Sequence, residues 1–475
     1  MVVQHNMQAA NANRMLNVTT GQQAKSTEKL SSGYRINRAA DDAAGLSISE
    51  KMRKQIRGLD KASSNAEDGV SSVQTAEGAL TEVHSMLQRM NELATQSANG
   101  TNSTTDRSAI QDEISQLTTE IDRVAETTKF NETYLLKGGD GTKLEYMKGH
   151  DAGLKGTLTD GTTTATFKVA AGALDEGKSV TIGGKDYTIG SAVADVQDAV
   201  DKLTAADDKV TVNDKTYTYV ATNSKAPGGQ TVTTAGWVLD GDKTSTTGTK
   251  LTIANGDKVT TTPKTGASAS YTAAEMDNGV SKADPSIISA EKAVSLMKDE
   301  LIAANKVGVT NGTVEITNPA YDKDNGVTFN INKGSAEVAN KLSFSLHVGS
   351  DADMTNKITV GIETMNSSYL GIKGLNVNDD SGIAGTYAID AISDALQKVS
   401  DQRSSLGAVQ NRLEHTIDNL DNVVENTTSA ESRIRDTDMA KEMVNYSKNN
   451  ILAQAGQSML AQANQSNQGV LSLLQ

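Results

Sequence analysis

The sequence contains no cysteine, which excludes a disulfide framework and a thiolate metal site. It also lacks an apolar run of the roughly 18 residues that a membrane-spanning helix needs. The opening segment, Met1–Asn6, has neither a basic nor an apolar region, so we expect no conventional signal peptide. A chain without cysteine suits export in the unfolded state.

Aromatic residues and proline are also scarce. One Trp, four Phe and eleven Tyr occur in 475 residues. Because aromatic side chains supply the largest burials in globular cores, we expect thin cores about two helices wide. All four prolines lie between residues 227 and 319. Proline inside a helix costs ~3 kcal/mol or more, so its absence near the ends agrees with long helical arms.

Positive charge is in deficit. Asp and Glu number 59 against 45 Lys and Arg, which gives a formal net charge of −14. Phosphate backbones and anionic membranes attract basic surfaces rather than acidic ones. The composition therefore disfavours nucleic acid or a membrane as a partner.

Two stretches, one near each end, carry apolar or small residues at alternating steps of four and three. Such heptad spacing lets long helices pack side by side. We therefore expect a mainly α fold, a long antiparallel coiled-coil hairpin built from both chain ends with a β-rich module at its tip. The main positions are Ile48, Leu59, Ala62, Ala66, Val73, Ala76, Leu80, Val83, Leu87, Met90 and Ala94, and Ile392, Ala395, Val399, Gln402, Leu406, Val409, Leu413, Leu420, Val423 and Ile434.

The segment between these stretches changes in composition and period. A further helix is predicted over Ile110–Val124, after a polar turn at Asn99–Ser103. Beyond Gly141, alternation around turn residues predicts hairpins at Val180–Ile189, Val210–Tyr219 and Leu251–Val259. Short helices are expected at Val193–Leu203 and Ile287–Leu301, and strands at Leu342–Leu346 and Ile358–Ile362.

Four motifs at the two ends carry a family resemblance. Leu30–Leu46 and Leu87–Asn99 resemble the N-terminal signature of bacterial flagellins, and Ala453–Asn464 and Val470–Leu474 are similar to the flagellin C-terminus. Met1–Asn6 resembles the clostridial branch, including Lachnospiraceae. The resemblance covers roughly residues 1–138 and 342–475, and it leaves out the middle.

The resemblance implies a structural subunit that self-assembles into the extracellular flagellar filament and serves motility. It further implies unfolded export through the flagellar type III apparatus. The implied partners are other copies of the chain, an export chaperone, and the filament cap and junction proteins. The predicted parts are a polymerisation helix and joint at 1–45, rod helices at 46–140, an outward β-rich module at 141–341, strands and a rod helix at 342–439, and a polymerisation helix at 440–475.

The segment from Gly33 to Gly45 has two interpretations. Its small residues could form a linker and helix start, with Asp41 or Asp42 as N-cap. Alternatively it is a close-packed joint between subunits, at which Arg35 and Arg38 pair with acids of a neighbour. The resemblance favours the joint.

A second candidate surface contains Arg89, Leu93, Gln96 and Glu113. On spacing alone it is a solvated helix flank beside the heptad seam. The resemblance implies that these four residues match positions that vertebrate Toll-like flagellin receptors bind, on a surface otherwise used between subunits.

The chain ends in a leucine-rich tail. Val470, Leu471, Leu473 and Leu474 could be a frayed end. The resemblance implies instead that this tail binds the export chaperone first and then packs in the inner tube of the filament.

No pattern in the sequence indicates catalysis. The five histidines are isolated, without metal-ligand spacing. Asp322–Gly326 only faintly resembles a calcium loop, because its Gly falls one position early and no Glu follows. We therefore expect no catalytic, cofactor or metal site. The alternatives are a hook–filament junction protein and a secreted coiled-coil adhesin, with an enzyme third.

Overall fold

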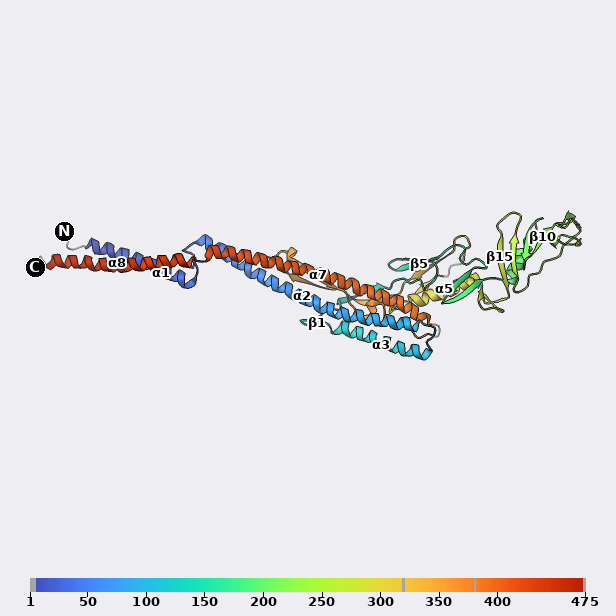
Figure 1. The fold of residues 1–475 in the computed structure, drawn as a ribbon, viewed down its shortest axis with the longest axis horizontal. Helices are drawn as coiled ribbons and strands as arrows, with labels where there is room; N and C mark the ends of the chain where they lie inside the picture. Colours follow the sequence, from blue (N-terminus) through green and yellow to red (C-terminus); the bar gives the residue numbers. More distant parts are fainter. Residues whose placement is uncertain (1–5, 318–320, 380–381, 473–475) are drawn as a thin grey trace. The chain divides into compact units, whose positions relative to one another are not determined.

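A computed structural model describes residues 6–317, 321–379 and 382–472. Long helices form both ends of the chain, and most of the strands lie between them (Figure 1). Contacts divide the structure into two compact units. The first contains the chain up to Gln74, Phe344–Val360 and the chain from Leu406 onward, and the second contains Thr75–Ser343 and Gly361–Ser405.

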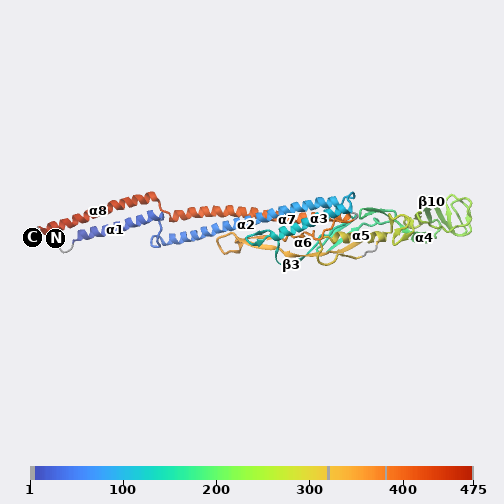
Figure 2. The ribbon, with the colours of Figure 1, turned by 90° about the horizontal axis from the view of Figure 1, so that it is seen from below.

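Two antiparallel helix pairs make up most of the first unit. Helix α1 (Met7–Ser32) lies beside α8 (Met439–Ser472) in both ribbon views (Figures 1 and 2). The first part of α2 (Ala43–Ser97) packs against the last part of α7 (Ile383–Arg435), where Ala62 and Leu420 share an apolar cluster. The two pairs have the same topology and differ in how much they bury.

A hairpin of β22 (Leu342–His347) and β23 (Lys357–Ile362) adds to the α2–α7 pair. It contacts α2 at Gly69, where an added Cβ would lie 2.2 Å from Leu346 Cδ1. Asn65 Nδ2 donates to the His347 carbonyl at 2.9 Å. Glycine in mid-helix is unfavourable by itself, so Gly69 is explained by this close approach.

In the second unit a third helix joins the remainder of α2 and α7. Helix α3 (Thr104–Thr127) begins with a capping box between Ser103 and Asp106 and buries Ile114 and Ile121. Arg107, only 3% exposed, fixes the turn before it by donating from Nε to the Ser97 carbonyl at 3.0 Å.

The β-rich part of this unit contains several apolar cores, two of which include a helix of at least nine residues. One surrounds α5 (Ala290–Asn305) and includes Phe167, Phe329, Met297 and Leu301. Its four-stranded sheet runs β19 (Glu315–Ile316), β20 (Val327–Asn332), β5 (Thr164–Val169), β4 (Thr157–Asp160), and its five-stranded sheet runs β16 (Met276–Asp277), β17 (Val280–Ser281), β18 (Ile287–Ile288), β7 (Lys185–Ile189), β6 (Ser179–Ile182).

The other core lies between α4 (Val193–Asp201) and a six-stranded sheet, and includes Val196, Val200, Trp237 and Ile253. The order is β13 (Gly236–Leu239), β10 (Lys215–Val220), β9 (Lys209–Val212), β14 (Lys258–Thr262), β15 (Ala269–Ala274), β8 (Ser191–Ala192). The smaller elements are β1 (Lys129–Phe130), β2 (Thr133–Tyr134), β3 (Gly139–Tyr146), β21 (Ser335–Asn340), β11 (Ser224–Lys225), β12 (Thr231–Val232), α6 (Ser367–Leu370) and the 3-10 turn Met354–Asn356.

The predicted heptad seam is confirmed over most of its length. Leu80, Leu87, Val399 and Leu413 are 0% exposed. The outermost positions are not buried, since Ile48 is 46% exposed and the last heptads of α7 are more open. The predicted hairpins at Val180–Ile189 and Val210–Tyr219 are the β6–β7 and β9–β10 pairs.

The third predicted hairpin, Leu251–Val259, is wrong. Strand β14 begins only at Lys258 and pairs with β9 and β15. The preceding segment covers α4 instead, because the Gln197 side chain donates to the Leu251 carbonyl and accepts from the Ile253 backbone N–H, each at 2.9 Å. A side-chain amide thus takes the hydrogen bonds that a partner strand would have used.

Candidate functional site

The joint segment is a short antiparallel connection within the first unit. Helix α1 ends because Gly33 adopts a left-handed conformation, with φ of 76°, and its N–H donates to the Lys29 carbonyl. Tyr34 then forms an isolated β-bridge with Asp436. Arg35 donates from its backbone N–H to the Arg435 carbonyl at 2.6 Å, and from Nη2 to the Ile434 carbonyl at 2.5 Å.

The loop after the bridge is held by its two aspartates. Asp42 is the N-cap of α2, since its Oδ1 accepts from the Gly45 backbone N–H at 2.8 Å. Asp41 Oδ2 accepts from the backbone N–H of Arg38 at 3.0 Å, and this hydrogen bond lowers the Asp41 pKa. Arg38 Nε donates to Glu28 of the same chain at 2.9 Å. Pairing of Arg35 and Arg38 with acids of a neighbouring subunit stays a prediction.

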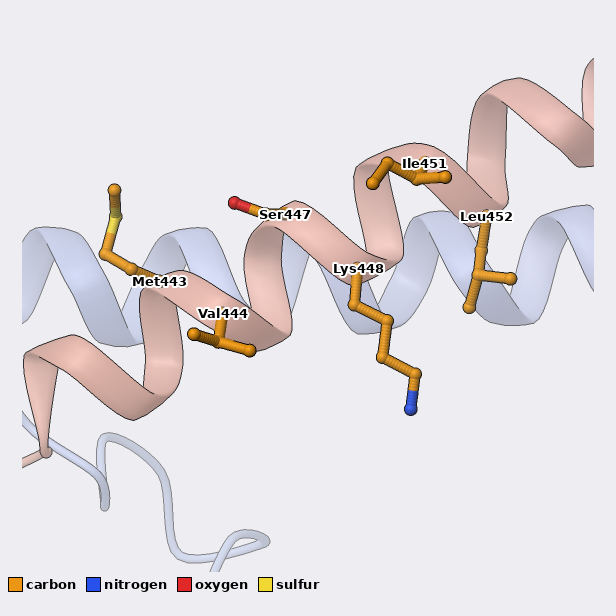
Figure 3. Close-up of a pocket in the computed structure, with 6 residues that line it drawn as sticks. All are labelled: Met443, Val444, Ser447, Lys448, Ile451 and Leu452. Carbon is orange, nitrogen blue, oxygen red and sulfur yellow. The ribbon is translucent and has the colours of Figure 1, made fainter.

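An apolar groove lies along α8, with a volume of about 490 Å³. In Figure 3 its side chains form two rows at helical spacing, one of Met443, Ser447 and Ile451 and one of Val444, Lys448 and Leu452. Val444 and Ile451 are each 67% exposed. Side chains of this size are normally buried, so the groove is an unpartnered apolar surface.

A second groove of about 760 Å³ lies where α1 and α8 meet, and it contains Met15 and Met459. These side chains are 61% and 64% exposed. Among the described residues of α1, Ser26 is the buried one. The α1–α8 pair thus buries little of its own apolar surface. The sequence predicted only a polymerisation helix at 440–475 and not this groove, although the spacing of four between Met443 and Ser447, and between Lys448 and Leu452, could have indicated it.

The Arg89 surface lies in the second unit, on α2 and α3. Arg89 Nε donates to Glu113 Oε1 at 2.9 Å, and Nη1 donates to Glu92 Oε2 at 3.1 Å. The pKa of Arg89 is raised, first by the hydrogen bond to Glu113 and then by that to Glu92. The Arg89 and Glu113 side chains are 50% and 44% exposed, and Gln96 is exposed as well.

Leu93 does not share that exposed face. It is 2% exposed and packed inside the chain. Its position beside the heptad seam points it inward, so the expected face of Arg89, Leu93 and Gln96 needs correcting. Leu93 supports the surface from below, and Arg89, Gln96 and Glu113 form it.

The tail residues lie at the limit of the described chain. Val470 and Leu471 belong to α8, but their side chains are outside the described part, as are Leu473 and Leu474 entirely. Within residues 6–317, 321–379 and 382–472, no group of three or more His, Asp or Glu is placed to hold a metal ion. No helix of that same part is long and apolar enough to cross a membrane.

Comparison with known proteins matches both ends of the chain to models of one protein family. Residues 3–140 match the Bacterial flagellin N-terminal helical region, and residues 389–474 match the Bacterial flagellin C-terminal helical region. A flagellin of Clostridium tyrobutyricum is 41% identical, over 98% of this chain and 100% of the relative. Flagellin B of Vibrio anguillarum is 34% identical over 99% of each chain, and a Bacillus subtilis flagellin is 33% identical over 100% of each. The chain therefore belongs to the bacterial flagellins, the structural subunits of the extracellular flagellar filament.

Proposed function

We propose that this flagellin polymerises head to tail through the apolar surfaces of α1 and α8. The observation that carries the proposal is the exposure of Val444, Ile451, Met15 and Met459, at 67%, 67%, 61% and 64%. An interface that joins one surface patch to a different patch of an identical chain does not close on itself, and it grows an open helix.

The driving force is burial of apolar surface, at roughly 25 cal/mol per Å². Alone, α1 and α8 bury too little to offset the entropy of ordering their backbones. Neighbouring subunits supply the missing contacts, so ordering of the ends is coupled to assembly. The ends are then loosely held in the monomer and helical in the filament.

Export and capping involve further partners. The chain travels unfolded through the flagellar type III apparatus, and Val470, Leu471, Leu473 and Leu474 bind the export chaperone before they enter the inner tube. Filament cap and junction proteins contact the assembled ends. Absence of cysteine supports this route, because no disulfide obstructs passage of an unfolded chain.

The Arg89 surface is proposed to bind host Toll-like flagellin receptors and to contact neighbouring subunits. Arg89 is accessible and its guanidinium already forms two carboxylate contacts, which hold its planar donor fork in place. Catalysis is not part of the proposed function, and neither the junction-protein nor the adhesin alternative explains the match of the whole chain to flagellins.

Electron microscopy of the purified chain after seeding tests the proposal. We expect filaments from the native chain and none from Ile451→Asp, because a carboxylate in the groove would be buried without a partner. Gln457→Glu is the matched control, since it adds the same charge at an exposed position of α8 outside both grooves. Filaments of normal length from Ile451→Asp would contradict the proposed interface.

A further inference from the structure

The ring of Tyr34 lies within contact distance of two guanidinium groups. Arg435 Cζ is 4.9 Å from the ring centroid and Arg53 Cζ is 5.8 Å from it. Both distances fall within the ~6 Å reach of a cation–π contact. Tyr34 follows α1, Arg53 belongs to α2 and Arg435 ends α7. One side chain therefore contacts both helices of the rod at the point where the chain leaves them.

Two carboxylates hold the guanidinium groups against the ring. Arg435 Nη1 donates to Glu50 Oε1 at 2.7 Å, and this hydrogen bond lowers the Glu50 pKa. Arg53 Nη2 forms an ion pair with Glu431 Oε1 at 3.7 Å. The side chains of Arg435 and Glu431 are each 12% exposed. Partly buried pairs are screened less by salt than surface pairs.

The hydrogen bonds alone do not fix Arg435. Its Nε is buried and has no hydrogen-bond partner among the residues that the structure describes. The Tyr34 ring, whose centroid is 4.9 Å from Arg435 Cζ, gives the guanidinium a further contact, since the negative face of an aromatic ring attracts a cation. Without the ring, the segment between α1 and α2 and the segment between α7 and α8 would be joined mainly through the short backbone pairing around the Tyr34–Asp436 bridge.

We propose that Tyr34 is a positioning residue for filament assembly. The cation–π contacts of its ring with Arg53 and Arg435, together called the Tyr34 clamp, fix the direction in which α1 and α8 leave α2 and α7. The inference rests on the proposal that α1 and α8 become ordered on assembly. Loss of the ring contacts should then affect assembly, while the rod helices of the monomer keep their fold.

Polymerisation of Tyr34→Leu and Tyr34→Phe, measured beside the native chain, tests the inference. Tyr34→Leu retains apolar bulk without a ring face, and Tyr34→Phe retains the ring without the hydroxyl. For Tyr34→Leu we expect at least a roughly threefold rise in critical concentration, or a changed filament waveform, because each cation–π contact is individually modest. Tyr34→Phe should match the native chain, and the helical circular dichroism of all three monomers should agree.

A double-mutant cycle with Arg435→Gln separates the clamp from simple packing. Once Arg435 is gone, Tyr34→Leu should change critical concentration by a smaller factor than it does in the native chain. Equal factors in both backgrounds, native behaviour of Tyr34→Leu, or equal defects in Tyr34→Leu and Tyr34→Phe would each overturn the inference. Failure of the native chain to form filaments would instead contradict the proposed function.

Discussion

The two helix pairs of this flagellin have the same antiparallel topology, but they differ in how far their apolar side chains are exposed. The α2–α7 pair closes its seam, so that Leu80, Leu87 and Val399 are 0% exposed. The α1–α8 pair leaves Val444 and Ile451 each 67% exposed. Both pairs are long, helical and antiparallel, so secondary structure does not distinguish them. The difference teaches that one pair is stabilised within the chain and that the other requires additional contacts.

The largest expected effect comes from removing α1 and α8, the pair whose apolar side chains remain exposed. A chain that begins at Ala43 and ends at Arg435 lacks α1 and α8 and keeps both rod helices. We expect complete loss of polymerisation with the helical fold of the rod retained. Sedimentation and circular dichroism measure the two properties on the same sample.

Limited proteolysis of the native monomer is the companion experiment. It should trim residues 1 to about 45 and about 440–475 first, because proteolysis follows local opening. Equal resistance of the ends and the rod would show that the α1–α8 pair is stable alone, and the comparison between the pairs would fail.

The next effect is a loss of stability that depends on which pair is changed. Leu87→Ala removes a side chain with 0% exposure from the sealed seam. We expect it to lower the free energy of unfolding by about 2–5 kcal/mol. Ile451→Ala, at a 67% exposed position, should change it by less than about 0.5 kcal/mol.

Urea denaturation of the monomer, followed by circular dichroism, measures both variants under the same conditions. Ile451→Ala should instead weaken polymerisation, because its side chain is buried only between subunits. Similar losses of monomer stability in the two variants would contradict the distinction.

A smaller effect is expected at the Arg89 surface, which is exposed beside the α2–α7 pair. Arg89→Ala should reduce affinity for a soluble Toll-like receptor ectodomain by at least about tenfold, since loss of an arginine at an interface centre commonly costs ~2 kcal/mol. Monomer stability should hardly change, because ion pairs of exposed side chains contribute about 0–1 kcal/mol.

Arg123→Ala is the matched control on α3. Its side chain is 60% exposed and also forms an ion pair, with Glu120. Leu93→Ala is a poor probe of docking, since its 2% exposed side chain supports the helix packing. Receptor binding that falls equally in Arg89→Ala and Arg123→Ala would point to general charge loss and refute the assignment.

The sequence predicted the regions where local pattern and burial agree. Heptad spacing identified α2 and α7, and alternation around Gly183-Gly184 and Asn213-Asp214 identified two hairpins, whose turn residues have the positive φ that such turns need. It could not predict which strands become neighbours in the middle, because those pairings join residues far apart in the chain. The Leu251–Val259 hairpin failed because Gln197, 54 positions before Leu251, takes the hydrogen bonds of Leu251 and Ile253, and because β14 pairs with β9.

For the site residues too, local spacing predicted some positions and could not predict contacts between distant parts of the chain. Spacing placed Arg89 on an exposed flank, but it also placed Leu93 there, since a heptad pattern does not define how wide the buried stripe is. The Tyr34 clamp was beyond sequence reasoning. Arg53 and Arg435 lie 382 positions apart, and each resembles an ordinary charged residue of a helix surface.

The smallest expected effect on the rod comes from the six-stranded module. Strands β8 and β15 are the first and last strands of the module along the chain, and they are parallel neighbours in the sheet, with Ser191 beside Ala273. The chain thus leaves and returns at adjacent strands, which lie about 4.8 Å apart. The module also has its own core around Trp237. It is therefore a nested insertion in the surrounding β-rich region.

Replacing residues 191–275 with a short Gly/Ser bridge between Gly190 and Met276 tests this arrangement. An ideal Cβ on Gly190 would lie 3.6 Å from Met276 Cε, so a bridge of a few residues suffices. We expect the unfolding temperature of the helical rod to be unchanged and polymerisation to persist, because the grooves on α1 and α8 are untouched. The wider deletion of about 142–338 also removes α5 and its core, so a loss of helical signal there but not in the nested deletion would show that α5 and its sheets support the rod. If the nested deletion itself lowered the unfolding temperature of the rod, the six-stranded module would contribute to the stability of the α2–α7 pair.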